Sequence, residues 1–235
     1  MHWLLTRPAE HNQALAARIA ALGQSVSVAP ALAVLPWCDD AQAGVWEQLA
    51  HMDALLFTSI NAVEQFAQEL ARREQAWPAA TCLAIGRATA DALATHGRTA
   101  TCPATGFTSE DLLALPLIDS LAGKSLLLVS GVGGRGLLAP SLVERGVKVT
   151  RLDVYRRVCS PDFAWPAQKV DGLLVTSLES WHCLLDKAGA ALRDCVVIAG
   201  SARIAASVTP VARKTFTAAS PSDDDMLAVL MEICR

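Results

Sequence analysis

The sequence lacks the features of a membrane-spanning or exported chain. None of its apolar runs approaches the ~18 consecutive residues of a membrane helix, although 52% of the 235 residues are hydrophobic. Near the start, Arg7 and Pro8 interrupt the apolar segment too early for a signal peptide. We therefore expect no membrane contact, and enough apolar residues for one large packed core or two smaller ones.

Charge of one sign is also scarce. The 20 basic and 23 acidic residues leave a net charge of −3, which offers no broad basic surface and argues against nucleic acid as a partner. An anionic small molecule stays open as a ligand, because helix N-termini bind anions without lysine.

The seven cysteines show no CxxC spacing. Their odd number and scattered positions argue against a disulfide framework and against a metal site, and favour a reducing cytoplasm. The cysteines are Cys38, Cys82, Cys102, Cys159, Cys183, Cys195 and Cys234.

Aromatic residues make up 5% of the chain and include one tyrosine, Tyr155. It lies in segment 151–158, Arg-Leu-Asp-Val-Tyr-Arg-Arg-Val. Segment 53–59, Asp-Ala-Leu-Leu-Phe-Thr-Ser, comes before it, and segment 171–177, Asp-Gly-Leu-Leu-Val-Thr-Ser, comes after it. Such a repeat indicates one structural unit used twice, so we interpret 151–158 as a crossing between two similar lobes.

Short apolar strands alternate with helical segments along the whole chain. This pattern predicts an α/β fold with two similar lobes, each a parallel sheet of about five strands flanked by helices, joined by a two-strand linker. The first lobe is expected at 1–31 and 160–235, the second at 37–150, and the linker strands at 32–36 and 151–159.

Helical spacing gives two local predictions. Leu15, Ile19 and Leu22 fall on one face of a helix that Gly23 ends. Segment 41–50 is expected to form a single helix at the start of the second lobe.

Other patterns predict the starts of two helices and the last strand of the second lobe. Asn61 with Glu64, and Thr176 with Glu179, have the spacing of capping boxes that open helices. Segment 147–150 is expected to be the last strand of the second lobe.

Ligands of parallel sheets bind beyond the carboxyl ends of the strands. The loops expected there are rich in Gly, Ser and Thr and poor in lysine, so they offer backbone N–H groups at helix starts, which suit carboxylates. If the lobes face one another, these loops converge on one cleft for a ligand with several carboxylates. The loops are 6–8, 58–61, 86–89, 131–136, 176–180 and 200–201.

One motif suggests a different function. Segment 131–136, Gly-Val-Gly-Gly-Arg-Gly, matches the dinucleotide-binding pattern, and Asp153 lies near the position of its ribose-binding acid. This would make the chain an NAD-type oxidoreductase. Against that interpretation, the motif follows the last strand–helix pair of its lobe, and tight turns need similar glycines.

The ordered set of motifs resembles the uroporphyrinogen-III synthase family over nearly the whole chain. The motifs are Leu-Thr-Arg-Pro at 5–8, Phe-Thr-Ser-x-Asn-Ala-Val at 57–63, Ala-Ile-Gly-x-x-Thr-Ala at 84–90, Ser-Glu at 109–110, Gly-x-Gly-Gly-Arg at 131–135, Val-Tyr-Arg-Arg at 154–157 and Val-Thr-Ser at 175–177. Ile60 departs from the small or polar residue expected within the second motif.

The resemblance implies a cytoplasmic, monomeric enzyme of tetrapyrrole (haem) synthesis that uses no cofactor. Its substrate would be hydroxymethylbilane and its product uroporphyrinogen III, formed with loss of water and inversion of ring D through a spiro intermediate. A transient contact with the preceding enzyme of the pathway is also implied. A two-lobe binding protein without catalysis is the remaining alternative, because a fold alone does not decide function.

Tyr155 is the candidate catalytic residue, since a phenol keeps its proton at neutral pH and could protonate the leaving hydroxyl. It could instead serve only to join the linker strands through its hydroxyl. Arg7 could pair with an acid near its own helix start, and at most one of Arg156 and Arg157 would face inward. The expected substrate-binding residues are Arg7, Thr58, Ser59, Asn61, Gly86, Thr89, Gly131, Gly133, Gly134, Arg135, Thr176, Ser177, Gly200 and Ser201.

Overall fold

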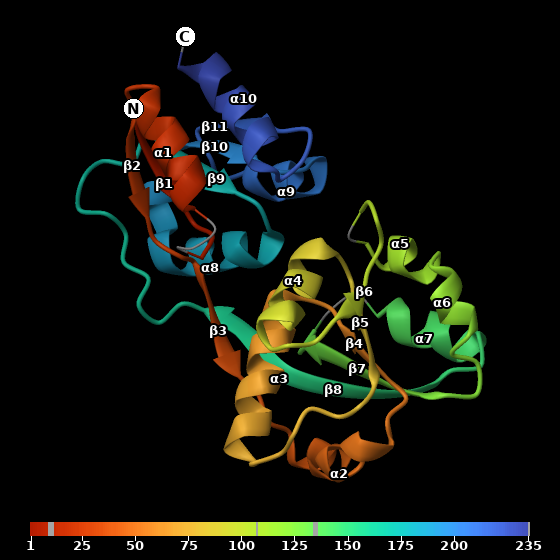
Figure 1. Cartoon of the computed structure of the whole chain (residues 1–235). Coiled ribbons are helices and arrows are strands. Elements are labelled where there is room, and N and C mark those ends of the chain that lie inside the picture. Colours follow the sequence, from red (N-terminus) through yellow and green to blue (C-terminus); the bar gives the residue numbers. More distant parts are fainter. Residues whose placement is uncertain (9–11, 107, 134–135, 235) are drawn as a thin grey trace. The chain divides into compact units, whose positions relative to one another are not determined.

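The computed structural model describes residues 1–8, 12–106, 108–133 and 136–234. The chain divides into two compact units, which we call unit 1 (Met1–Ala33 and Val158–Arg235) and unit 2 (Val34–Arg157). Each unit contains one sheet with helices on both faces (Figure 1), so the predicted α/β fold class is confirmed. In the part of the chain described, the helices are too short or too polar to cross a membrane.

The sheet of unit 1 is parallel, with the order β11-β10-β9-β1-β2. Its strands are β1 (His2–Leu5), β2 (Ser25–Val28), β9 (Gly172–Val175), β10 (Val196–Ala199) and β11 (Lys214–Thr217). Both chain ends contribute to it, because β9 lies between β1 and β10. Strand β11 lies at one edge of the sheet and β2 at the other.

Helices cover both faces of this sheet (Figure 1). Helices α1 (Gln13–Ala21) and α10 (Asp223–Ile233) share one hydrophobic core, whereas α8 (Leu178–Ala188) and α9 (Ala202–Val208) contribute to the other. A 3₁₀ turn, Gly189–Asp194, follows α8. Helix α1 ends at Ala21, so Leu22, which was expected on one helical face with Leu15 and Ile19, lies in the C-cap and is 38% exposed.

Unit 2 has six strands in the order β3-β8-β7-β4-β5-β6. They are β3 (Leu32–Pro36), β4 (Ala54–Phe57), β5 (Thr81–Ala84), β6 (Ala100–Thr101), β7 (Ser125–Gly131) and β8 (Lys148–Cys159). The predicted strand 147–150 is only the beginning of β8, a single strand of 12 residues. It continues because it pairs with β7 up to Tyr155 and with β3 over its second half, between the bonds from Trp37 N to Val154 O and from Ser160 N to Ala31 O, both at 2.9 Å.

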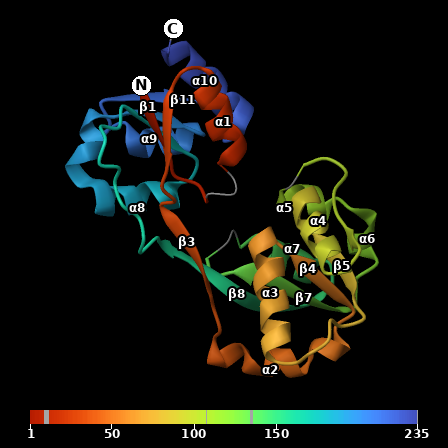
Figure 2. The same cartoon turned by 60° about the vertical axis from the view of Figure 1, so that its left-hand side comes forward.

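The helices of unit 2 also form two layers (Figure 2). Helices α2 (Ala43–Glu47), α3 (Ile60–Arg72) and α4 (Arg87–Thr95) cover one face, and α5 (Ser109–Leu113), α6 (Pro116–Asp119) and α7 (Leu138–Glu144) cover the other. The single helix predicted at 41–50 is wrong. That segment forms α2 between two 3₁₀ turns, Asp40–Gln42 and Leu49–His51, and Gly44 disfavours a longer helix.

Serine or threonine hydroxyls cap most of the longer helices and accept the backbone N–H three residues on. Ser59 caps α3 in this way and Ser177 caps α8. The predicted capping boxes at Asn61 and Thr176 are therefore wrong, because a serine that lies nearer the helix start binds the free N–H group first.

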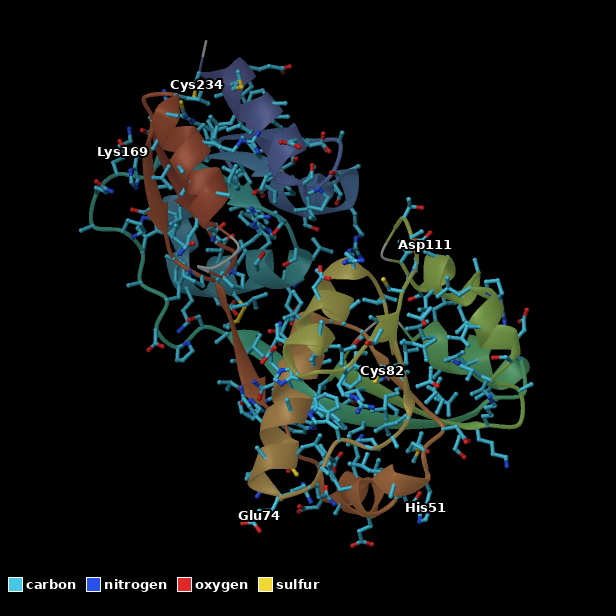
Figure 3. All side chains as sticks on the ribbon, in the orientation of Figure 1. His51, Glu74, Cys82, Asp111, Lys169 and Cys234 are labelled. Carbon is cyan, nitrogen blue, oxygen red and sulfur yellow. A yellow bond between two sulfur atoms is a disulfide. The ribbon has the colours of Figure 1, made fainter. Side chains whose placement is uncertain are left out.

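One pair of cysteines corrects the prediction made from their spacing. Cys159 at the end of β8 and Cys183 in α8 form a disulfide within unit 1. The other five cysteines are free, among them Cys82 and Cys234, which Figure 3 labels. Among the described residues, no three His, Cys, Asp or Glu side chains gather as a metal site would require.

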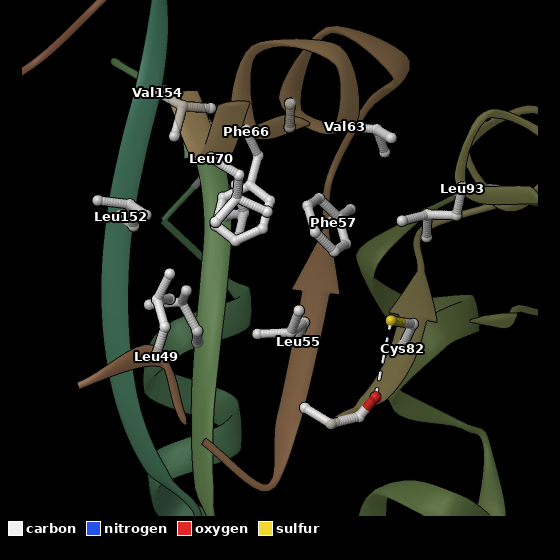
Figure 4. Packing of buried hydrophobic residues seen from close by; sticks show 14 of the residues in the cluster. Leu49, Leu55, Phe57, Val63, Phe66, Leu70, Cys82, Leu93, Leu152 and Val154 are labelled. Carbon is white, nitrogen blue, oxygen red and sulfur yellow. Dashed lines mark hydrogen bonds between the residues drawn. The ribbon is translucent and has the colours of Figure 1, made fainter. Parts of the chain in front are cut away.

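The larger core of unit 2 explains why α3 packs where it does. Val63, Phe66 and Leu70 recur at helical spacing and point from α3 to the sheet (Figure 4). Phe66 packs edge-on against Phe57 of β4, with ring centroids 5.4 Å apart. Burial of each such side chain contributes about 1.5–3 kcal/mol, which fixes the start of α3 at the carboxyl end of β4.

Candidate functional site

A cavity of about 260 Å³ lies in unit 2, where β4, β5 and β7 end. Its wall contains hydroxyl groups, two arginines and few large apolar side chains. The lining residues are Thr58, Ser59, Ile85, Thr108, Ser109, Leu128, Ser130, Gly131, Gly136, Leu138, Ala139, Arg151, Tyr155 and Arg157. It is placed where the sheet topology predicts a ligand, beyond the carboxyl ends of parallel strands.

A β-bulge brings Tyr155 into this cavity. The register of β7 with β8 pairs Ser130 with Asp153, but pairs Gly131 with Tyr155, so one extra residue of β8 turns the tyrosine toward the end of β7. Val132 N then donates to Tyr155 O at 2.8 Å and fixes the turned backbone. A Cβ atom at Gly131 would lie less than 3.0 Å from the tyrosine ring. The aromatic ring therefore accounts for this glycine without any nucleotide.

The phenol of Tyr155 has one protein partner in the described structure. Its oxygen lies 3.1 Å from Ser59 Oγ, and either group can be the donor. Ser59 Oγ also accepts Ala62 N–H at 3.1 Å as the cap of α3. The tyrosine is 4% exposed. One of these two hydroxyls thus donates to the other at the start of a helix.

The charge that faces the cavity is positive. Arg151 and Arg157 line it, and none of the described lining residues is acidic. Arg156 is turned elsewhere, with its guanidinium 4.8 Å from the centre of the Trp37 ring, in agreement with the prediction that at most one of Arg156 and Arg157 faces inward. Arg151 was not among the predicted site residues, because the sequence does not reveal which strand lies beside β7.

Asp153 does not serve as a ribose-binding acid. Its Oδ1 accepts Ser130 Oγ at 2.7 Å and Arg151 Nε at 3.0 Å. Both bonds lie inside the β7–β8 pair, so the carboxylate is occupied by protein groups. The dinucleotide interpretation loses its acid as well as its requirement for Gly131.

The start of α5 supplies two further hydroxyl residues that the predicted set omitted, Thr108 and Ser109. Thr108 caps the helix and forms a capping box with Asp111, which Figure 3 labels. Thr108 Oγ1 donates to Asp111 Oδ2 at 2.7 Å. Nothing in the sequence showed that this loop reaches the cavity.

The other predicted residues of unit 2 that the structure describes lie outside the cavity wall. Asn61 is the second residue of α3, and Thr89 is buried in the first turn of α4, which Gly86 precedes as N-cap. Gly133 is exposed, with a φ of 88° that favours glycine. Gly134 and Arg135 lie outside the described residues. Of the predicted residues that the structure describes, Thr58, Ser59, Gly131 and Tyr155 meet at the cavity.

In unit 1 the corresponding strand ends enclose almost no space. Arg7 Nη2 binds Asp223 Oδ1 at 2.5 Å, so this arginine pairs with the first turn of α10 and not with its own helix. Thr176 lies beside Arg7 at a hollow with no room for a water-sized group. Ser177 caps α8 and Ser201 caps α9, directly after Gly200.

This arrangement has a definite chemical capacity. A buried phenol can give a proton to a leaving group while the adjacent hydroxyl stabilises the phenolate. Two guanidinium groups and free backbone N–H groups at the start of α3 can hold carboxylates nearby. The site is suited to an anionic substrate that loses a hydroxyl group.

Comparison with known proteins gives concordant results. The family model described as uroporphyrinogen-III synthase HemD matches residues 13–228. Uroporphyrinogen-III synthase of Escherichia coli K12 is 34% identical over 189 residues, which are 76% of each chain. That of Proteus mirabilis is 32% identical over 79% of this chain and 98% of its own.

Solved structures show the same fold. A uroporphyrinogen-III synthetase from Helicobacter pylori aligns with a TM-score of 0.65 at 16% identity, over 99% of this chain and 100% of its own. A mutant uroporphyrinogen III synthase from the extremely thermophilic bacterium Thermus thermophilus aligns with a TM-score of 0.61 at 20% identity, over 100% of this chain and 99% of its own. At these identities the likeness concerns the architecture of two sheets flanked by helices.

Proposed function

This chain belongs to the uroporphyrinogen-III synthase family, and from that premise we propose that it converts hydroxymethylbilane into uroporphyrinogen III at a site that includes the unit 2 cavity. The chain is a hydro-lyase of tetrapyrrole biosynthesis. The assignment of its catalytic groups is part of this proposal.

In the proposed reaction the hydroxyl of the terminal hydroxymethyl group is protonated and leaves as water, and the methylene carbon that remains is the electrophilic centre of an azafulvene cation. The substituted α-carbon of ring D attacks this cation and forms a spiro intermediate. The intermediate opens and closes again on the other α-carbon, which inverts ring D and releases a proton. Substrate equals product plus water, so the balance requires neither an oxidant nor a reductant.

Tyr155 is the proposed proton donor to the leaving hydroxyl. The observation that supports this role is the 3.1 Å contact between Tyr155 Oη and Ser59 Oγ in a cavity without acidic lining residues. Ser59 would stabilise the phenolate, and the proton released at ring D would restore the phenol. A positioned acid of this kind contributes ~10²-fold or more to the rate.

Substrate carboxylates are proposed to bind mainly to backbone N–H groups at helix starts. Ser59 uses its hydroxyl for the N–H of Ala62, which leaves the N–H groups of Ile60 and Asn61 for a ligand. Ser177 and Ser201 leave similar groups on α8 and α9. Arg7 is the exception, because Asp223 already holds its guanidinium. The remaining proposed binding residues are Thr58, Gly86, Thr89, Gly131, Gly133, Gly134, Arg135, Thr176 and Gly200.

This positioning is also proposed to select the isomer. Closure without an enzyme joins the free end and gives the symmetric type I ring. Holding the carboxylates so that the substituted carbon of ring D meets the cation is catalysis by orientation. Many weak backbone contacts suffice for this, so no single binding side chain is indispensable.

We further propose that the enzyme acts as a monomer in the cytoplasm. The five free cysteines support a reducing compartment. Alkylation of the protein in intact cells, followed by mass spectrometry, would show whether Cys159 and Cys183 are paired there.

The deciding assay supplies freshly prepared hydroxymethylbilane, oxidises the products to porphyrins and separates the ring isomers. We expect the type III isomer at a rate far above spontaneous closure. Formation of the type I isomer alone, or of neither isomer above the spontaneous rate, would overturn the proposal.

A further inference from the structure

We propose that Arg151 binds a carboxylate of the ring that carries the leaving hydroxyl, and that Asp153 is the positioning residue for its guanidinium. This inference rests on the proposed function and assigns one side chain of the unit 2 cavity to one part of the substrate.

Two of the donor groups of Arg151 are engaged by the protein. Its Nε donates to Asp153 Oδ1 at 3.0 Å, and its Nη2 donates to Gly131 O at 3.3 Å. A guanidinium has five N–H donors, so three remain without a partner among the described residues, on Nη1 and Nη2. The side chain is 39% exposed and lines the cavity. The remaining Nη1 and Nη2 donors can therefore bind a planar carboxylate through two hydrogen bonds.

Asp153 is held more firmly than a surface acid. Its side chain is 16% exposed, and Ser130 Oγ donates to it at 2.7 Å. The backbone N–H of Asp153 also donates to Gln42 Oε1 at 3.2 Å. Ser130 therefore fixes the carboxylate of Asp153 and Gln42 fixes its backbone, and the carboxylate in turn fixes the direction of the Arg151 side chain.

Gly131 connects this arginine with the proposed acid. Its carbonyl oxygen accepts from Arg151, and its Cα packs against the ring of Tyr155. Arg151 and Tyr155 are thus neighbours of one residue at the end of β7. A ligand group that receives a proton from Tyr155 and a carboxylate bound to Arg151 must lie close together.

The size of the cavity identifies how much of the substrate it holds. Pockets for drug-sized ligands measure about 300–1,000 Å³, and this cavity measures about 260 Å³. It is suited to one substituted pyrrole ring of the four. Because Tyr155 is proposed to protonate the leaving hydroxyl, that ring is the one that bears the hydroxymethyl group.

Carboxylate binding by Arg151 and a purely structural ion pair with Asp153 have different consequences for ligand binding. An exposed arginine–aspartate pair contributes little to stability, and its loss would affect a charged and an uncharged ligand equally. An arginine that binds a carboxylate discriminates between an acid and its ester.

The test compares Arg151→Gln with Arg156→Gln, which removes the same charge from the same strand. The probe is a monopyrrole that carries one acetate and one propionate, measured as an inhibitor beside its dimethyl ester. In the wild type and in Arg156→Gln we expect the acid to bind more tightly than the ester. In Arg151→Gln we expect binding of the acid to weaken about tenfold to a hundredfold, and binding of the ester to change less than twofold.

Two further variants keep the test informative if Arg151→Gln folds poorly. Arg151→Lys retains the charge without the planar fork and should restore part of the acid preference. Asp153→Asn should weaken binding of the acid by a smaller factor and again leave binding of the ester nearly unchanged. Thermal unfolding of each variant separates loss of binding from loss of fold.

The outcomes distinguish this inference from the proposed function. Arg151→Gln that weakens acid and ester equally, or a wild type that binds both equally, overturns the assignment of Arg151 even if the wild type forms the type III isomer. A wild type that forms only the type I isomer overturns the proposed function itself.

Discussion

Asp53 in unit 2 and Asp171 in unit 1 occupy the same place in two similar sheets. Each precedes the central strand of its sheet and accepts a backbone N–H from the neighbouring strand: Ser125 N at 2.8 Å in unit 2 and His2 N at 2.9 Å in unit 1. The aspartate at the start of each repeated segment therefore fixes the register of two parallel strands. The repeat in the sequence is a repeat of this contact.

The Thr-Ser pair that ends each repeated segment behaves differently in the two units. Ser59 and Ser177 both cap a long helix. Ser59 also meets the phenol of Tyr155, whereas Ser177 Oγ donates to Ser180 Oγ at 2.9 Å. The identical Thr-Ser pair gives the same cap in both units. In unit 2 the long strand β8 also brings Tyr155 to the capping serine, which connects the cap with the proposed acid.

Both units also place a glycine against an aromatic ring. A Cβ at Gly131 would lie less than 3.0 Å from the Tyr155 ring, and one at Gly172 would lie as close to the Trp3 ring. Trp3 is completely buried in a hydrophobic core, while Tyr155 borders a cavity. The same packing device thus stabilises a core in unit 1 and positions a reactive group in unit 2.

The largest expected effect concerns the disulfide of unit 1. The disulfide Cys159–Cys183 spans 24 residues, and a loop of that length stabilises the folded state by about 3 kcal/mol. We expect reduction, or Cys159→Ala with Cys183→Ala, to lower the free energy of unfolding by this amount and to increase hydrogen exchange in β9 and β10. Hydrogen exchange in β4 and β7 of unit 2 should change little.

The control for this effect is Cys38→Ser, which alters an exposed free cysteine. Reductant should lower the stability of this variant as it does that of the wild type. Complete alkylation of Cys159 and Cys183 in the folded, unreduced protein would contradict the prediction.

Tyr155→Phe should have the next largest effect and tests the chemical role of unit 2. Loss of the donor is expected to lower kcat about a hundredfold, which corresponds to ~2.7 kcal/mol. Affinity for uroporphyrinogen III should fall much less, because the ring and its packing against Gly131 remain. Equal losses of kcat and product affinity would show that the hydroxyl is structural.

The parts of the fold that the sequence predicted correctly depend on local signals. Strand β4 lies at 54–57, inside the first repeated segment, and its apolar run with a capping serine after it can be read locally. The N-cap roles of Ser59, Ser177 and Ser201 follow from the same preference. The two mistaken capping boxes arose where two candidate caps lie close together, and there the serine nearer the helix start competes successfully.

The parts that could not be predicted depend on which strands are neighbours. Arg151 and Ser130 become site residues only because β8 lies beside β7 with a bulge after Ser130. The disulfide was missed for the same reason, since Cys159 and Cys183 meet through tertiary packing. Sequence spacing reveals that two strands are neighbours, or that one of them is bulged, only when a short turn joins them. Helix α7 lies between β7 and β8, so the spacing revealed neither their pairing nor the bulge.

Ser59→Ala and Ser177→Ala are a matched pair for the two repeated caps. Each removes one N-cap hydroxyl, so each should lower the free energy of unfolding by ~1 kcal/mol. Only Ser59→Ala also removes the partner of Tyr155, and it should lower kcat severalfold while Ser177→Ala leaves kcat within about twofold. Steady-state rates and urea unfolding of both variants measure the two effects, and equal kcat values would show that Ser59 is a cap alone.

The smallest expected effect is the pH dependence of the aspartate contact in unit 1. The backbone N–H of His2 is the main cause that lowers the pKa of Asp171 below its usual value. A lowered pKa in the folded state means that this carboxylate stabilises the fold above about pH 4, the usual pKa of aspartate. The stabilisation is lost as the pH falls through the lower pKa of the folded state.

Asp171→Asn should therefore be less stable than the wild type at pH 6, and the difference should shrink as the pH falls below about 4. The effect is small because the side chain is 31% exposed and solvent screens its charge. Urea unfolding between pH 6 and pH 3 measures it, with Asp53→Asn as the matched variant at the repeated position of unit 2. Stability curves of the wild type and Asp171→Asn that stay parallel throughout this range would show that the bond from His2 fixes the strand register without favouring the charged carboxylate.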